Sequence, residues 1–177
     1  MIQAFTQEEN KISVWSISNG SISSQSFENA ALPPVDDLAD IAVVFDYKAL
    51  CRSEEFFRQL PPEKVFDIKL ACYVKDPACS AESLAECAAR FLPPETTPEN
   101  DGGKLLALYT LLADEMEKNP VFRQLEMPLS PVLAAMEMRG IILDKAALLL
   151  FKEKLEKSIV EAQNAVFSAA GKTFNIN

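Results

Sequence analysis

The sequence predicts an α/β protein, because strand patterns come first, a strand–helix alternation follows, and helical patterns fill the rest. Residues 41–45, IAVVF, form a continuous apolar run, which is typical of a strand buried on both faces. Residues 145–170 repeat apolar side chains at helical spacing. Of the 177 residues, 49% are hydrophobic and 24% are charged, an ordinary globular balance that allows a buried core.

The N-terminal part of the chain predicts strands. Residues 1–5 predict a short strand, and residues 11–27 predict a β-hairpin that turns at Asn19-Gly20. The Asn-Gly pair favours the positive φ angles of a type I′ turn. Residues 32–40 predict a loop with at most one helical turn, and the buried strand at 41–45 follows it.

Helical patterns begin after the buried strand. The first starts at Asp46 and ends before two prolines, Pro61 and Pro62. Residues 64–77 predict a short extended piece and then a helix that ends before Pro77. Ser80 is the expected N-cap of the next helix.

A loop and a longer helix complete this part. Residues 93–103 predict a loop by their composition, and residues 104–119 predict a helix. The inward face of that helix is expected to carry Leu105, Leu108, Leu111, Leu112 and Met116.

The pattern changes after Pro120, so we expect one domain at residues 1–119 and a helical segment at residues 120–177. A helix is expected to run to Arg139 and to stop at Gly140, with a brief extended stretch after it. Asp144 then caps a helix of about 40 Å that ends at Gly171. Its apolar stripe is too long to be buried by the short remainder, so it requires a partner.

Composition excludes several classes of function. The net charge of −9 makes the chain alone a poor nucleic-acid binder, because such binding depends on basic side chains. The sequence contains no histidine, which excludes Ser-His and Cys-His catalysis. The four cysteines form no CxxC pair, so we expect reduced thiols and no zinc site. No apolar run approaches the length of a membrane helix and no signal segment follows Met1, so we expect a cytoplasmic protein.

Three motifs occur between residues 66 and 177. Residues 126–144 have the spacing E-x-P-L-x-x-V-L-x-x-M-E-x-x-G, three apolar residues and D, and residues 170–177 have A-G-x-x-F-N-x-N. Residues 66–92 carry Phe66-Asp67 and a following Leu84-Ala85 helix pattern. With these motifs the chain resembles the family A DNA polymerases, the DNA polymerase I type.

The resemblance implies a ribonuclease H-like 3′–5′ exonuclease-type domain, a mixed sheet with flanking helices, at residues 1–119. Residues 120–177 would be a linker helix and the start of the thumb in the polymerase domain. The parent would be a DNA polymerase of bacterial replication and repair, in the cytosol and nucleoid. Its palm, fingers and remaining thumb, its DNA and its Mg²⁺ ions would be partners of this segment, which needs no cofactor itself.

The exonuclease chemistry of the family requires a cluster of carboxylates that holds two metal ions. The resemblance places Thr6, Glu8, Leu50 and Gly102 at the four carboxylate positions. Glu8 alone retains an acid, and a hydroxyl, a leucine and a glycine cannot hold hard cations by charge. We therefore expect an exonuclease-like domain with no catalytic residue and no metal site.

Two alternatives stay open. A shift in register would make Asp46 and Asp101 ligands together with Glu8, and the chain would then be an active metal-dependent exonuclease. The long helix would otherwise serve a protein-interaction module, or self-association, through its apolar stripe. The simplest interpretation of Glu8, Asp46 and Asp101 is that they are solvated surface charges or helix caps.

Four residues are candidates for contact with a DNA backbone. Lys145 and Lys152 lie in the predicted long helix, and Lys172 and Asn175 follow it at positions that the resemblance places near the template–primer. The alternative is a solvated helix face of mixed charge. Trp15 lies in the hairpin, where a core position is favoured over a base-stacking role.

Overall fold

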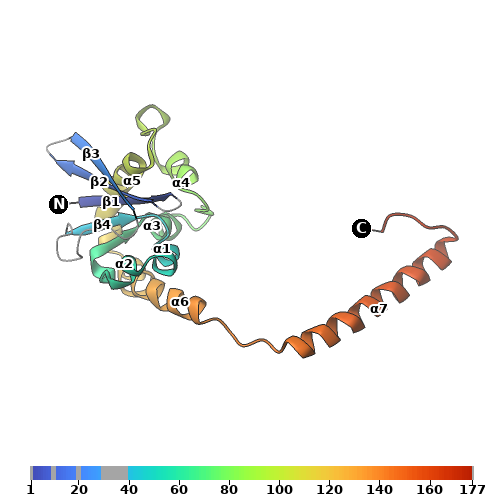
Figure 1. Ribbon diagram of the computed structural model, residues 1–177. Coiled ribbons are helices and arrows are strands. Elements are labelled where there is room, and N and C mark those ends of the chain that lie inside the picture. The colour runs from blue at the N-terminus through green and yellow to red at the C-terminus, as the bar shows by residue number, and fades with distance from the viewer. Residues whose placement is uncertain (1, 9–10, 19–20, 29–39, 177) are drawn as a thin grey trace. The chain divides into compact units, whose positions relative to one another are not determined.

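The computed structural model describes residues 2–8, 11–18, 21–28 and 40–176 (Figure 1). They form two compact units that divide between Arg139 and Gly140. The first unit holds the sheet and most helices, and the second holds one long helix. The predicted boundary between residues 119 and 120 concerns the domains of a longer parent, and it stays a prediction.

The first unit is built on a mixed five-stranded sheet with the order β3-β2-β1-β4-β5. β1 pairs antiparallel with β2, and β2 pairs antiparallel with β3. β4 runs parallel to β1, and β5 runs parallel to β4. The predicted α/β class is therefore confirmed. The strands are β1 (Ile2–Glu8), β2 (Lys11–Ser18), β3 (Ser21–Glu28), β4 (Ile41–Val44) and β5 (Val65–Asp67).

The predicted hairpin is present as β2 and β3, with Ser18 opposite Ser21 in the register. The turn residues Asn19 and Gly20 lie outside the described part of the chain, as do residues 32–39 of the predicted loop.

Helices cover both faces of the sheet. Neighbouring residues of a strand point to opposite faces, so each strand contacts helices on both sides. Phe5 of β1 packs against Phe56 and Phe57 of α2, with ring centroids 6.2 and 5.9 Å away. Thr6 points the other way, toward Trp15 of β2 and α5, which packs on β1, β2 and β4. The helices of this unit are α1 (Tyr47–Ser53), α2 (Glu55–Gln59), α3 (Ile68–Lys75), α4 (Leu84–Phe91), α5 (Asp101–Glu117) and α6 (Met127–Arg139).

Capping residues fix where the helices begin. Asp46 accepts a hydrogen bond from the Ala49 N–H at 2.9 Å and starts α1. The N-cap of α4 is Ser83, which accepts from the Glu86 N–H at 3.2 Å, so the prediction of Ser80 was wrong. Ser80 instead donates its hydroxyl to the Glu86 side chain.

Helix α5 begins three residues earlier than the sequence pattern predicts. Asn100 accepts from the Gly103 N–H at 2.7 Å and caps it, so residues 101–103 are helical although their composition is typical of a loop. The predicted inward face is correct for Leu105, Leu108, Leu112 and Met116, which are buried. It is wrong for Leu111, which is 53% exposed.

The helix predicted after Pro120 extends to Arg139, but its first part is a π-helix at Val121–Glu126. The Met127 N–H donates to the Phe122 carbonyl, five residues back, as a π-helix requires. Pro131 lies inside α6, where it removes a main-chain donor. The Ser130 hydroxyl donates to the Glu126 carbonyl at 3.1 Å nearby.

The π-helix directs Arg123 to the edge of the sheet. Its Nη1 donates to the Val65 carbonyl of the edge strand β5 at 2.7 Å, and its Nε donates to Glu117 at 2.7 Å. The guanidinium also lies 5.7 Å from the Phe66 ring centroid. Arg123 therefore joins α5, the π-helix and β5, and it satisfies an edge carbonyl.

The second unit contains α7 (Lys145–Ala170). Asp144 accepts from the Ala147 N–H at 3.0 Å, and Gly171 ends the helix at a φ of 65°, as the sequence predicts. Phe174 folds back onto Phe167, with 5.6 Å between ring centroids. Residues 141–143, predicted to be extended, form no regular element.

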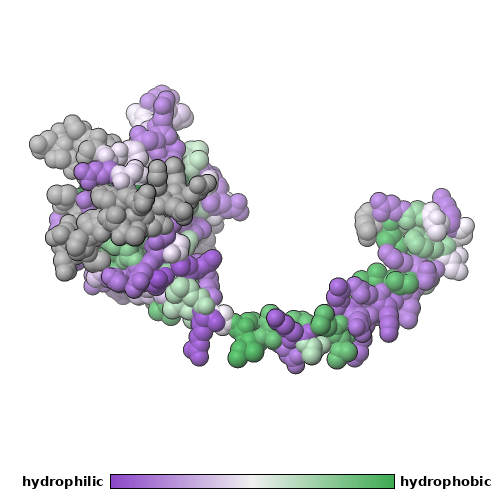
Figure 2. Space-filling view, in the orientation of Figure 1, coloured by the Kyte–Doolittle hydropathy of each residue, from purple (hydrophilic) through white to green (hydrophobic). Residues whose placement is uncertain are grey.

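Apolar side chains of the second unit are exposed, and Figure 2 shows them on the segment before α7 and along this helix. On α7 itself they include Leu148, Phe151, Leu155, Ile159 and Val166. Among the helices that the structure describes, none is long and apolar enough to cross a membrane.

Replacing Arg123 with methionine should lower the free energy of unfolding by about 2–3 kcal/mol, because a buried carbonyl and a carboxylate lose a charged donor. Urea unfolding followed by circular dichroism measures the change. The control is Lys118→Met, which removes a mostly exposed pair with Asp114 and should cost under about 0.5 kcal/mol. Equal stability of the two variants would show that Arg123 does not hold β5.

Candidate functional site

A cleft of about 270 Å³ lies where β1 and β4 end, the edge of a parallel sheet region that most often carries a ligand site. Strands, α1, α4 and α5 each contribute side chains to it. Its lining is Phe5, Thr6, Gln7, Phe45, Ala49, Leu50, Leu84, Asp101 and Leu105. Six of these nine side chains are apolar, so the cleft is poor in groups that bind charge.

The fold places two of the four predicted exonuclease positions in this cleft and a third next to one of its lining residues. Thr6 and Leu50 line it, and Gly102 follows the lining residue Asp101 in the first turn of α5. Glu8 is the last residue of β1, but its side chain lies outside the described part of the structure. The functional meaning of these four positions stays a prediction.

Trp15 lies between two of these positions. Its indole Nε1–H donates to Thr6 Oγ1 at 3.0 Å. A Cβ atom at Gly102 would come closer than 3.0 Å to three atoms of the indole ring, so the ring touches the Gly102 backbone. The sequence predicts Trp15 only as a core residue, because nothing local links position 15 to position 102.

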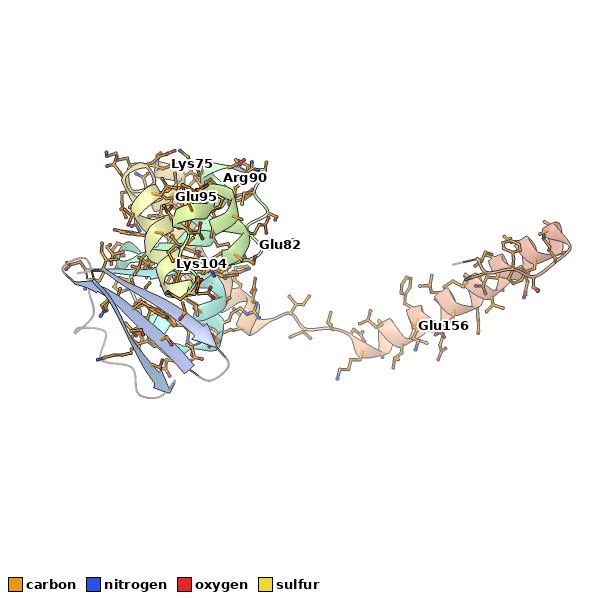
Figure 3. All side chains as sticks on the ribbon, turned by 90° about the horizontal axis from the view of Figure 1, so that it is seen from above. Lys75, Glu82, Arg90, Glu95, Lys104 and Glu156 are labelled. Carbon is orange, nitrogen blue, oxygen red and sulfur yellow. The ribbon has the colours of Figure 1, made fainter. Side chains whose placement is uncertain are left out.

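Asp101 is the carboxylate among the described residues that line the cleft. Asp101 forms an ion pair with Lys104 at 2.7 Å, and its side chain is 57% exposed (Figure 3 labels Lys104). Asp46 lines a different pocket. Within residues 2–8, 11–18, 21–28 and 40–176, no group of three or more acidic, cysteine or histidine side chains is placed to hold a metal ion.

Two Mg²⁺ ions do not fit this donor set. Hard cations take charged or carbonyl oxygens, whereas Leu50 offers only methyl groups and Gly102 offers no side chain. The Thr6 hydroxyl oxygen already accepts the indole N–H. The described residues of the cleft therefore supply no ligand cage for divalent cations.

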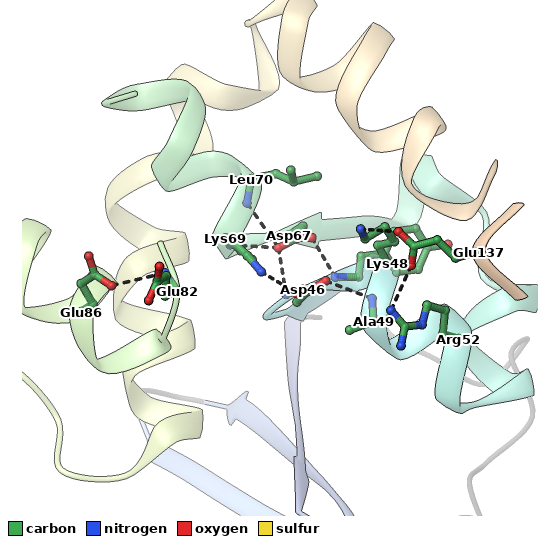
Figure 4. A network of polar contacts seen from close by, with 11 residues as sticks. Asp46, Lys48, Ala49, Arg52, Asp67, Lys69, Leu70, Glu82, Glu86 and Glu137 are labelled. Carbon is green, nitrogen blue, oxygen red and sulfur yellow. Dashed lines mark hydrogen bonds and ion pairs between the residues drawn. The ribbon is translucent and has the colours of Figure 1, made fainter. Parts of the chain in front are cut away.

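A second, polar pocket of about 220 Å³ lies beside the first turns of α1 and α3 (Figure 4). Its centre is Asp67, which is 1% exposed and caps α3. The Tyr47 N–H donates to its Oδ2 at 2.7 Å, and the Lys69 N–H donates to its Oδ1 at 2.9 Å. The Asp46 N–H also donates to Oδ1, at 3.1 Å. Asp67 therefore joins the starts of two helices.

The pKa values of the two aspartates of this pocket shift in opposite directions. Burial raises the pKa of Asp67 to about 6, against the Tyr47 N–H bond, and the Asp46 carboxylate adds to the rise. Burial also opposes the charge of Asp46, but its hydrogen bond with Lys69 Nζ, 2.6 Å long, keeps the pKa below its usual value. Asp46 thus caps α1 and pairs with Lys69, while its role as a ligand with Glu8 and Asp101 stays a prediction.

The last turn of α6 is bound to α1 by ion pairs (Figure 4). Glu137 lies 2.7 Å from Lys48 Nζ and 2.9 Å from Arg52 Nη1. These two hydrogen-bonded cations lower the pKa of the Glu137 carboxyl. Glu137 belongs to the M-E motif at residues 136–137. Its ion pairs hold α6 against α1, so this motif residue has a structural role.

The four candidate DNA contacts all belong to the second unit. Lys145 is the first residue of α7, and Lys152 lies 3.7 Å from Glu156, which Figure 3 labels. Lys172 and Asn175 follow the helix end at Gly171. Their contact with a DNA backbone stays a prediction.

A carbon-detected NMR titration of the carboxyl groups should find Asp67 near pH 6 and Asp46 below its usual range. Since the pKa of Asp67 is higher in the folded chain than in the unfolded one, folding takes up a proton between about pH 4 and pH 6. The stability that this group contributes is fully present below about pH 4 and is lost as the pH rises through 6. A midpoint for Asp67 below pH 4 would show that the main-chain donors outweigh burial.

Comparison with known proteins gives several related sequences, although no family model matches the chain. DNA polymerase I of Bacillus subtilis (strain 168) is 31% identical over 138 residues, 63% of this chain and 16% of that protein. DNA polymerase I of Geobacillus stearothermophilus is 31% identical over 139 residues, 64% of this chain and 16% of that protein. The thermostable DNA polymerase I of Thermus filiformis is 31% identical over 152 residues, 83% of this chain and 18% of that protein.

The matched segments thus cover less than one fifth of these relatives. Together with the motifs at residues 66–92, 126–144 and 170–177, these similarities confirm that the chain is related to one segment of the family A DNA polymerases, the DNA polymerase I type.

Proposed function

We propose that this chain is the exonuclease-like part and the thumb base of a DNA polymerase I-type enzyme. In this proposal the first unit is a scaffold without exonuclease activity. The similarity to three bacterial DNA polymerases I supports the parentage. The parent would act in DNA replication and repair in the bacterial cytosol.

The sheet topology supports a ribonuclease H-like fold for the first unit. Its order is β3-β2-β1-β4-β5, and only β2 runs antiparallel to the other strands. The resemblance predicts such a mixed sheet with flanking helices. We therefore assign the cleft at the ends of β1 and β4 to the position of an exonuclease site.

The observation that carries the proposal is the side-chain chemistry of this cleft. Thr6 and Leu50 line it and Gly102 follows the lining residue Asp101, and none of these three has a carboxylate. Two-metal hydrolysis needs carboxylates to hold both ions and to activate water. Among the described residues, no group of three or more acidic side chains is placed to hold the ions that would generate hydroxide and stabilise the leaving oxygen.

The polymerase active site would lie in other parts of the parent, because the matched segments cover 16–18% of the relatives. The palm, the fingers and the remaining thumb would hold the Mg²⁺ ions and most of the DNA contacts. Lys145, Lys152, Lys172 and Asn175 would add backbone contacts from the thumb base. The exposed stripe of α7 would then be covered by the rest of the polypeptide.

The same stripe favours a second candidate, a protein-interaction module that binds a partner or a second copy through α7. Leu155, 49% exposed, lies at its middle, and Leu148 and Ile159 flank it. Exposed apolar surface of this extent is typical of an interface. The two candidates differ in whether the isolated chain associates.

With single-stranded DNA and Mg²⁺ or Mn²⁺, the chain should release no nucleotides above the background without metal. The reason is the lack of a carboxylate cluster in the cleft. Denaturing gel electrophoresis of a 5′-labelled oligonucleotide measures this, and an active proofreading exonuclease serves as the positive control. Metal-dependent release that Glu8→Ala abolishes would establish the active-exonuclease alternative.

Sedimentation velocity across a range of concentrations separates the scaffold from the interaction module. We expect the chain to remain monomeric at micromolar concentration, because its natural cover is the rest of the parent. The interaction module requires concentration-dependent association that Leu155→Glu removes. The matched control is Leu111→Glu, at a leucine of similar exposure on α5, which should leave any association unchanged.

A further inference from the structure

Trp15 is the one tryptophan of the sequence, and it contacts the cleft residue Thr6. It lies on β2 opposite Ala4 of β1, and its Nε1–H donates to Thr6 Oγ1 at 3.0 Å. The indole is partly buried and packs against the core. One side chain therefore links β2 to β1 by a hydrogen bond and to α5 by ring contact.

Gly102 is adapted to this ring. A Cβ there would lie closer than 3.0 Å to Cδ2, Cγ and Cδ1 of Trp15, a separation that real Cβ atoms essentially never show. Gly102 is buried in the first turn of α5, and glycine favours a helix less than alanine does. The close approach of the ring explains why a residue unfavourable to a helix occupies this position.

We propose that the Trp15 side chain fills the volume beside Thr6 and Gly102 in which carboxylates would hold divalent cations. The inference rests on the proposed function, since it concerns the same cleft. An aspartate at position 102 and the indole exclude each other sterically. The Trp15 indole thus packs against both Thr6 and Gly102. Carboxylates introduced at positions 6 and 102 would not by themselves create a metal site, because the indole would still fill the volume between them.

A double-mutant cycle between positions 15 and 102 tests the contact. Gly102→Ala should reduce the folded-to-unfolded ratio by roughly tenfold or more in the natural background, because an extra methyl overpacks the site. In the Trp15→Val background the same change should be neutral or stabilising, because alanine favours the helix. Urea unfolding followed by circular dichroism gives both values.

The sign of the Gly102→Ala effect decides the outcome. An equal loss in both backgrounds would overturn the inference, because the methyl group would then clash with something other than the indole. The fluorescence of Trp15 gives a second readout that does not need the valine variant. Gly102→Ala should shift the emission to longer wavelength as the ring moves toward water, and an unchanged spectrum would contradict the contact.

Metal binding tests the exclusion itself. Two folded variants are compared by the electron paramagnetic resonance signal of free Mn²⁺: Thr6→Asp with Leu50→Asp and Gly102→Asp, and the same set with Trp15→Val. Only the set with Trp15→Val should bind Mn²⁺. Equal binding by both sets, or binding by neither, would overturn the role of Trp15.

The proposed function fails separately from this inference. Metal-dependent nuclease activity of the natural chain would contradict the proposed function. An inactive natural chain in which Gly102→Ala has the same effect with and without Trp15 would contradict only the present inference.

Discussion

The contact of the Trp15 indole with the Gly102 backbone is the packing constraint that ties the start of α5 to the sheet of the first unit. Through this contact β2 meets the start of α5, and the indole N–H of Trp15 donates a hydrogen bond to Thr6 Oγ1. The ring leaves no room for a side chain at position 102. We propose that this packing, together with the absence of a carboxylate at positions 6, 50 and 102, makes the first unit a scaffold.

Much of the fold follows from local patterns in the sequence. The run at residues 41–45, the hairpin residues and the caps at Asp144 and Gly171 are predicted well, because each depends on neighbours along the chain. The start of α5 is missed, since Gly102 and Gly103 lower helix propensity and Asn100 supplies a cap that outweighs it. The π-helix at Val121–Glu126 is also missed. It places Arg123 against Val65, and local sequence patterns do not reveal a contact that spans 58 positions.

The candidate site shows the same division. The motif resemblance assigns Thr6, Leu50 and Gly102 to the site; Thr6 and Leu50 line one cleft, and Gly102 follows its lining residue Asp101. The role of Trp15 is not predictable from the sequence, because it depends on a tertiary contact. In the second unit the sequence predicts the apolar stripe of α7, which is exposed there. The local pattern does not show what covers this stripe. From the similarity to DNA polymerase I, we propose that other parts of such a polymerase cover it.

The central claim is that packing by Trp15 has replaced metal binding in the cleft of the natural chain. The most direct measurement is a Mn²⁺ titration of this chain, with the quenching of its single tryptophan as the readout. Bound Mn²⁺ is paramagnetic and would quench an indole that lies against it. The account predicts no saturable quenching at millimolar Mn²⁺. Saturable quenching with two ions bound per chain would contradict it.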